Sequence, residues 1–141
     1  MKKQTFEMEL EGKTLTAEFN NLTEQANGSV ILKYGETAIL VTAVMSSRDN
    51  PGLSYFPLSV EFEEKFYAAG QILGSRFQRR EGRPSDEAVL SARIIDRTIR
   101  PLFNQSLRKD VQVVVTVLAM GDDDPDVLGV IGASLALSVS D

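Results

Sequence analysis

The chain has 141 residues, 43% of them hydrophobic, and carries 15 Lys and Arg against 20 Asp and Glu, for a formal net charge of −5. This length and composition fit one globular domain with a hydrophobic core, and they exclude a disordered chain or a disulfide-stapled miniprotein. The sequence contains neither cysteine nor histidine. Thiol nucleophiles, Ser-His-Asp triads and Cys or His metal sites are therefore excluded, which leaves carboxylates, Lys, Arg, hydroxyls, backbone amides or an oxygen-ligated metal.

The N-terminal part of the sequence is predicted to form a β-hairpin. Apolar and acidic side chains alternate over residues 6–10, the alternation resumes over residues 15–19, and Gly12 lies between them, which indicates two half-buried strands. Gly12-Lys13-Thr14 lacks the earlier glycine of a phosphate-binding P-loop, so a hairpin turn is the better interpretation. The start of the chain shows no signal peptide, and no segment approaches the roughly 18 apolar residues of a membrane helix. We therefore expect a cytoplasmic protein with no membrane partner.

Three further strands are predicted before the middle of the chain. Residues 29–34 form one, and residues 37–45, apolar on both faces, are typical of a buried central strand. Residues 46–54 are predicted to form a loop. Apolar side chains alternate again over residues 56–62, and Pro57, which has no N–H to donate, predicts an edge strand or a bulge there.

A helix is predicted after a long loop over residues 67–86. Ser85 is a good N-cap, and Pro101 ends the helical pattern. One face of the helix is expected to be buried and consists of Ala88, Ala92, Ile95, Ile99 and Leu102. Another face carries Arg93, Arg97 and Arg100. Three guanidinium groups are thus expected on one side of this helix.

One more strand and one more helix are predicted in the C-terminal part. Residues 111–119 are rich in β-branched side chains, and Asp124 is placed to cap a helix that begins near Val127. That helix is apolar nearly all round and rich in Gly, Ala and Ser, as in helices packed closely on several sides. The elements together predict an α+β fold in which a mainly antiparallel sheet packs against helices.

Positive charge is concentrated in one segment. Residues 76–109 hold nine of the 15 Lys and Arg but only four of the 20 Asp and Glu. Most of the nine are arginines, whose planar guanidinium groups bind phosphate with two hydrogen bonds and stack on bases. Phe77 lies beside the loop arginines and adds a stacking surface, as in sites for single-stranded nucleic acid. The segment therefore indicates a polyanion site.

Other charged motifs have plainer interpretations. Asp96 and Arg100, four residues apart, are expected to pair within the helix. The aspartates of residues 122–126 could hold Mg²⁺ or Ca²⁺, but they fit no EF-hand spacing, and helix capping is the more ordinary role. Glu63 and Glu64 are neighbours on a strand and point to opposite faces, so a catalytic carboxylate pair is not expected.

A long run of this sequence also resembles a known family. The first core domain of bacterial polynucleotide phosphorylases is closely similar to AAGQILGSRFQRREGRPSDEAVLSARIIDRTIRPLF, residues 68–103, and residues 55–58, 125–128 and 131–134 agree as well. The resemblance implies that residues 1–141 are the first RNase PH-like domain of that family, truncated at its C-terminal end. It further implies a phosphate-dependent 3′→5′ exoribonuclease, active in mRNA turnover, that releases nucleoside diphosphates.

The resemblance implies site residues and partners. The loop that holds single-stranded RNA in the family's central pore corresponds to residues 77–85. The residues expected to bind RNA are Phe77, Arg79, Arg80 and Arg83, together with the neighbouring Arg76. The helix arginines, Arg93, Arg97 and Arg100, are further candidates for phosphate or interface contacts. The family places its phosphate and Mg²⁺ sites in a second core domain, so no catalytic residue or metal ligand is expected in this chain. It assembles as a trimeric ring, and degradosome-type partners are expected.

The sequence therefore predicts the RNA-binding, pore-lining part of a phosphorolytic exoribonuclease, inactive on its own. Two alternatives stay open. In one, the segment serves ring assembly and its arginines make interface contacts without touching RNA. In the other, the same arginines form a small site for phosphate or a single nucleotide.

Overall fold

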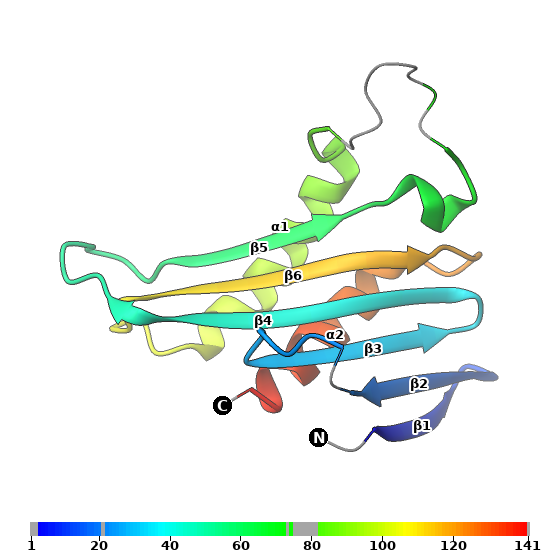
Figure 1. Cartoon of the computed structure of the whole chain (residues 1–141), viewed down its shortest axis with the longest axis horizontal. Helices are drawn as coiled ribbons and strands as arrows, with labels where there is room; N and C mark the ends of the chain where they lie inside the picture. The colour runs from blue at the N-terminus through cyan, green and yellow to red at the C-terminus, as the bar shows by residue number, and fades with distance from the viewer. Residues whose placement is uncertain (1–2, 21, 73, 75–81, 141) are drawn as a thin grey trace.

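The computed structural model describes residues 3–20, 22–72, 74 and 82–140. Within these residues the chain forms a six-stranded sheet with the order β1-β2-β3-β4-β6-β5, and the helices α1 and α2 lie against one face of it (Figure 1). The elements are β1 (Gln4–Leu10), β2 (Lys13–Phe19), β3 (Gly28–Tyr34), β4 (Thr37–Asp49), β5 (Leu58–Glu63), the 3₁₀ turn η1 (Phe66–Ala69), α1 (Asp86–Ile99), the 3₁₀ turn η2 (Arg100–Leu102), β6 (Lys109–Ala119) and α2 (Pro125–Ser138). Neighbouring strands are antiparallel except β5 and β6, which are parallel. The predicted α+β class is confirmed.

The N-terminal hairpin forms as predicted, but its first strand is not half-buried. Glu11 and Gly12, with φ of 51° and 80°, make the turn, and Lys13 starts a strand rather than a helix. Phe6 is 60% exposed and touches Phe19 edge-on, with the ring centroids 5.9 Å apart. The prediction of burial is wrong because α2 lies behind β3 and β4 and leaves β1 uncovered (Figure 1).

The central and edge strands lie where the sequence placed them. β4 is flanked by β3 and β6, as predicted for residues 37–45, but it continues to Asp49 with an irregular register against β6. Residues 46–49 therefore belong to a strand and not to the predicted loop. β5 is an edge strand that begins directly after Pro57, whose carbonyl accepts a hydrogen bond from the Val111 N–H (3.0 Å).

α1 begins at the predicted cap, because the Ser85 hydroxyl accepts a hydrogen bond from the Ala88 N–H (3.0 Å). The members of the predicted stripe that are buried or half-buried are Ala88, Ala92, Ile95 and Ile99. Leu102 is 81% exposed, so its predicted burial is wrong. After Ile99 the chain tightens into η2, and the three residues per turn of a 3₁₀ helix rotate Leu102 away from the stripe.

Glycines allow α2 to approach the sheet and α1 at the same time. A Cβ on Gly132 would lie 2.5 Å from Cγ2 of Val41 on β4, and one on Gly129 would lie 2.8 Å from Cδ1 of Ile95 on α1. Leu128, Ala133 and Ala136 are buried on the same helix. The predicted close packing of this helix on several sides is confirmed, and its buried residues belong to the hydrophobic core.

Replacing Gly132 with valine should destabilise the fold. The new side chain would overlap fully buried Val41, and overpacking of this kind costs about 1–3 kcal/mol. Ser134→Val, at an exposed position of the same helix, is the matched control and should change the free energy of unfolding by less than about 1 kcal/mol. Urea unfolding followed by circular dichroism measures both, and wild-type stability of Gly132→Val would contradict the packing described above.

Candidate nucleic-acid interface

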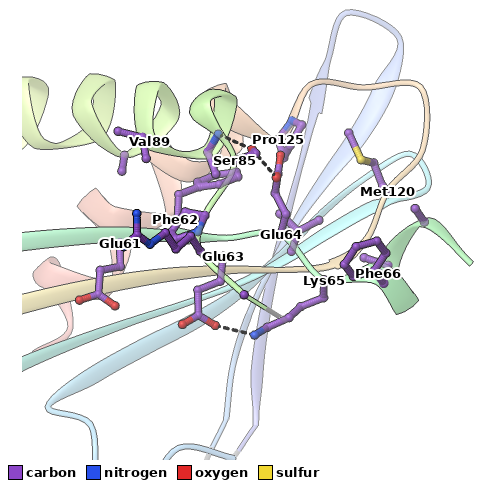
Figure 2. A pocket seen from close by; sticks show the side chains of 18 of the residues that line it. Glu61, Phe62, Glu63, Glu64, Lys65, Phe66, Ser85, Val89, Met120 and Pro125 are labelled. Carbon is purple, nitrogen blue, oxygen red and sulfur yellow. Dashed lines mark hydrogen bonds and ion pairs between the residues drawn. The ribbon is translucent and has the colours of Figure 1, made fainter. Parts of the chain in front are cut away.

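A pocket of about 840 Å³ lies where the end of β5, η1 and the first half of α1 meet. Its apolar lining includes Phe62, Ala88, Ala92, Val117 and Met120. Figure 2 shows Glu63, Glu64 and Lys65 leaving the end of β5 on one side, with Ser85 and Val89 belonging to the start of α1 on the other. The pocket therefore lies between β5, which precedes the arginine-rich residues 76–83 in the sequence, and α1, which follows them.

A short chain of hydrogen bonds joins the two ends of the segment between β5 and α1. The Ser85 hydroxyl donates to Glu64 Oε2 (2.7 Å) and accepts from the Ala88 N–H (3.0 Å), as the dashed lines in Figure 2 show. A hydroxyl has one donor and two acceptor sites, so it can make both bonds at once. The N-cap of α1 is thereby tied to the residue that directly follows β5.

The adjacent carboxylates Glu63 and Glu64 diverge, as expected. Glu63 Oε2 lies 2.9 Å from Lys65 Nζ, whereas Glu64 turns towards Ser85 (Figure 2). Both carboxylates are therefore engaged separately. This arrangement does not provide the paired carboxylates that general acid–base chemistry would use.

Every acidic side chain that lines the pocket already has a partner. Besides Glu63 and Glu64, Glu61 accepts a hydrogen bond from Gln112 (3.0 Å) and Asp96 is bound by Arg100. The lining arginines differ: within the part of the chain that the structure describes, neither Arg83 nor Arg93 has a hydrogen bond or an ion pair. The charged groups of the pocket that have no described partner are therefore positive, which favours an anionic ligand.

Arg100 is used by the fold itself. Its guanidinium binds Asp96 with two hydrogen bonds, Nε to Oδ2 at 2.9 Å and Nη2 to Oδ1 at 2.6 Å. It also donates to the carbonyls of Leu58 (3.0 Å) and Phe56 (3.4 Å), the two residues that flank Pro57. The predicted Asp96–Arg100 pair is confirmed, and the Asp96 carboxylate raises the pKa of Arg100. Arg100 thus clamps the end of α1 to the start of β5.

The structure divides the predicted arginines by location. Arg83 and Arg93 line the pocket, and Arg97 is exposed on α1 but does not line it. Arg100 forms the clamp just described. Arg76, Phe77, Arg79 and Arg80 lie outside the described residues. Their role as RNA ligands stays a prediction.

The aspartates before α2 have structural partners. Lys13 Nζ donates to both carboxylate oxygens of Asp123 (2.6 and 2.8 Å), which raises the pKa of Lys13. Asp124 caps α2 by accepting from the Asp126 N–H (3.0 Å). In the described ranges no three acidic side chains gather as a metal ion would require. These residues therefore do not fit a Mg²⁺ site.

Sequence reasoning missed several residues of the pocket wall. They come from the segment after β5 and from the end of β6: Glu64, Lys65, Phe66 and Met120. No local motif marks them, because they meet through strand pairing and through the Met120 N–H, which donates to the Ala68 carbonyl (3.0 Å). In the same described residues, no helix is long and apolar enough to cross a membrane.

Comparisons with known proteins agree on one family. Residues 11–141 match the model of the 3′ exoribonuclease family, domain 1 (RNase PH). Polyribonucleotide nucleotidyltransferase from Heliobacterium modesticaldum is 54% identical over 98% of this chain and 20% of its own length, and that from Exiguobacterium sibiricum is 53% identical over 99% and 19%. The chain thus spans about a fifth of the length of the curated relatives it matches.

Solved structures show the same fold at low sequence identity. A chain of the Archaeoglobus fulgidus exosome with RNA bound to the active site superposes with a TM-score of 0.66 at 20% identity, covering 99% of this chain and 51% of that one. A chain of an archaeal exosome core gives a TM-score of 0.55, also at 20% identity, covering 99% of this chain and 49% of that one. The arrangement of a mixed sheet and two helices is therefore a fold that this chain shares with these exosome chains.

Replacing Arg100 with methionine should loosen the edge of the sheet. The change leaves Asp96 without its partner and the Leu58 carbonyl without its side-chain donor, while the Phe56 carbonyl keeps the Leu58 N–H. This should cost about 1–2 kcal/mol at this partly exposed site. Arg97→Met, at an exposed position of the same helix without a described partner, is the control and should stay within about 0.5 kcal/mol of wild type. Urea unfolding measures both, and equal losses for the two variants would refute the clamp.

Proposed function

Because the chain belongs to the 3′ exoribonuclease family, domain 1, we propose that it is the RNA-binding, pore-lining part of a phosphate-dependent 3′→5′ exoribonuclease. In such a reaction, inorganic phosphate attacks the phosphorus of the terminal phosphodiester bond, and the bond to the 3′ oxygen of the preceding nucleotide breaks. The products are a nucleoside diphosphate and an RNA that is one nucleotide shorter, with a free 3′-hydroxyl. The chain's own task would be to hold the single strand while the reaction takes place elsewhere in the protein. Degradation of mRNA is the proposed cellular use.

One observation carries this proposal, namely that the pocket contains positively charged side chains without a described partner. Arg83 and Arg93 line it without described partners, while all of its lining carboxylates are engaged. In the sequence, Arg83 follows the arginine run of residues 76–80 after two intervening residues. A single strand held by that run would meet a pocket in which the charged groups without a described partner are guanidinium groups. Such groups contact phosphates irrespective of base sequence.

The proposal gives this chain no catalytic residue. Phosphoryl transfer needs metal and phosphate held beside the scissile bond, and the described residues do not fit a Mg²⁺ site. We place the Mg²⁺ ligands and the phosphate co-substrate site in other parts of the protein. We also propose a cytoplasmic homo-oligomer, a trimeric ring as in the family it resembles, with degradosome-type partners.

A mononucleotide site is the second candidate. The pocket volume of about 840 Å³ lies within the roughly 300–1,000 Å³ of small-molecule sites, and its apolar lining could accept a base while an arginine holds the phosphate. Ligand length separates the two functions. A channel for a strand binds longer oligonucleotides more tightly, whereas a nucleotide site is saturated by one nucleotide.

Replacing Arg79, Arg80 and Arg83 together with alanine should weaken RNA binding through lost phosphate contacts. Each contact contributes roughly −0.7 to the slope of log K against log[salt] for single strands. The triple variant should therefore flatten that slope by about 2, equally for oligo(U) and oligo(A). Fluorescence anisotropy with oligonucleotides of increasing length, at several salt concentrations, measures the slope, and circular dichroism checks that the variant is folded.

The matched control for this experiment removes positive charge away from the pocket. Lys33 and Arg48 are exposed on β3 and β4, and their double alanine variant should leave the slope within experimental error. An unchanged slope in a folded triple variant would remove RNA contact from this loop and favour the ring-assembly alternative. Affinity that does not increase beyond a mononucleotide would favour the second candidate.

The purified chain should not phosphorolyse RNA. The proposal places phosphate and metal elsewhere, so the chain can bind a strand without cleaving it. Incubation with radiolabelled RNA, phosphate and Mg²⁺, followed by chromatography for nucleoside diphosphates, measures this directly. Product formation that co-purifies with the chain and exceeds a mock preparation would show a reaction centre in this domain.

A further inference from the structure

The outer face of α1 carries exposed apolar side chains at its centre. Leu90 and Ile94 are 58% and 50% exposed, although the opposite face of the helix packs on the core. Glu87 and Arg97 flank them, and their side chains are exposed and have no described partner. We call these four residues the α1 seam. Their spacing of three, four and three residues keeps them on one face of the helix.

The α1 seam is complementary to itself when two copies meet in antiparallel orientation. From the N- to the C-terminus of α1, the seam consists of an acidic, two apolar and a basic side chain. In an antiparallel pair, the acidic side chain of each copy therefore lies opposite the basic side chain of the other. Leu90 then lies opposite Ile94 of the second copy, and Glu87 lies opposite Arg97 at both ends of the contact. Glu87 and Arg97 are ten residues apart, about 15 Å along the helix, so the two ion pairs flank a small apolar centre.

A simpler explanation accounts for only part of the seam. An acid near the start of a helix and a base near its end both suit the helix dipole within a single chain. That effect gives no reason for two large apolar side chains to be exposed between them. Burial of apolar area is the main favourable term in association, and opposite charges at the rim set the orientation of the partners.

We propose that the α1 seam docks onto the α1 seam of a second copy of this chain, with the two helices antiparallel about a two-fold axis. The same patch is used on both copies, as in isologous dimers. The seam lies apart from the pocket, because none of the four seam residues lines it; the α1 residues that do are Ala88, Val89, Ala92, Arg93 and Asp96. Docking thus leaves the pocket arginines available. A contact this small forms a weak dimer, with Kd on the order of 0.1 mM.

Charge reversal at the seam tests the proposed register. In a dimer of the Glu87→Arg variant, two positive side chains would face each other at both ends of the contact. In a dimer of the Arg97→Glu variant, two negative side chains would do so. Either change should weaken dimerisation about tenfold or more, because two attractive pairs become repulsive. Sedimentation equilibrium of the whole chain at low salt measures the Kd of each variant.

Mixing the two variants separates a contact between copies from an effect within one copy. The Glu87→Arg copy is positive at both ends of its seam and the Arg97→Glu copy is negative at both ends. In their heterodimer opposite charges therefore meet at both ends of the contact, so mixing should recover a Kd within about threefold of wild type. The double variant Glu87→Arg/Arg97→Glu restores opposite charges at both ends and should recover a Kd within about threefold of wild type. Circular dichroism of the single and double variants checks that helix content is unchanged.

Matched controls use the same substitutions elsewhere on the surface. Glu24 and Arg48 are exposed and lie outside α1, so Glu24→Arg and Arg48→Glu should keep the wild-type Kd. Leu90→Gln/Ile94→Gln should abolish dimerisation, while Val127→Gln, at a 63% exposed position of α2, should not. A chain that stays monomeric at millimolar concentration, or reversals that leave the Kd unchanged, would overturn the proposal. So would a double variant that does not recover. RNA affinity is measured separately, so failure here leaves the proposed function untouched.

Discussion

Parallel pairing of β5 with β6 obliges the chain to travel back along the sheet between these two strands. β5 ends at Glu63, opposite Thr116, while β6 starts at the other end with Lys109. α1 makes the return: its 14 residues span about 21 Å, close to the roughly 20 Å of the six residues of β5. The start of α1 therefore meets the end of β5 at the pocket, and its last turn meets the start of β5 at the Arg100 clamp.

The two ends of α1 use charge in different ways. At its C-terminal end, Arg100 is occupied by one carboxylate and two backbone carbonyls. Near its N-terminal end, the carboxylates that line the pocket have other partners, whereas Arg83 and Arg93 line the pocket without a described partner. One helix thus carries both a structural arginine and an available one, seven residues apart. Counting arginines in the sequence cannot make this distinction, because it depends on which carbonyls and carboxylates the fold brings within reach.

Most of the fold could be predicted from local sequence patterns. The alternation of apolar and polar side chains located the strands, and Ser85 marked the start of α1. Pro57 indicated an edge strand, because the missing N–H of a proline can be recognised from the sequence alone. Two mistakes are local, namely the exposure of Leu102 after the change to a 3₁₀ turn and the extent of β4. The others concern relations between distant segments. The exposure of Phe6 depends on where α2 ends over the sheet, and the pocket wall depends on the parallel pairing of β5 and β6. The pair Asp96–Arg100 was predictable from its four-residue spacing, whereas the partner of Glu64 lies 21 positions away and has no such signal.

The hydrogen bond between Glu64 and Ser85 has a consequence for how this region can vary. It closes a segment of 20 residues at its base, where the strand and the helix are both anchored. The entropy lost on closing such a loop grows only with the logarithm of its length, by about 0.6 kcal/mol for each doubling. Insertions or deletions between η1 and α1 therefore leave the register of α1 against the sheet nearly undisturbed. The scaffold can keep its geometry while the length of this segment adapts to different ligands.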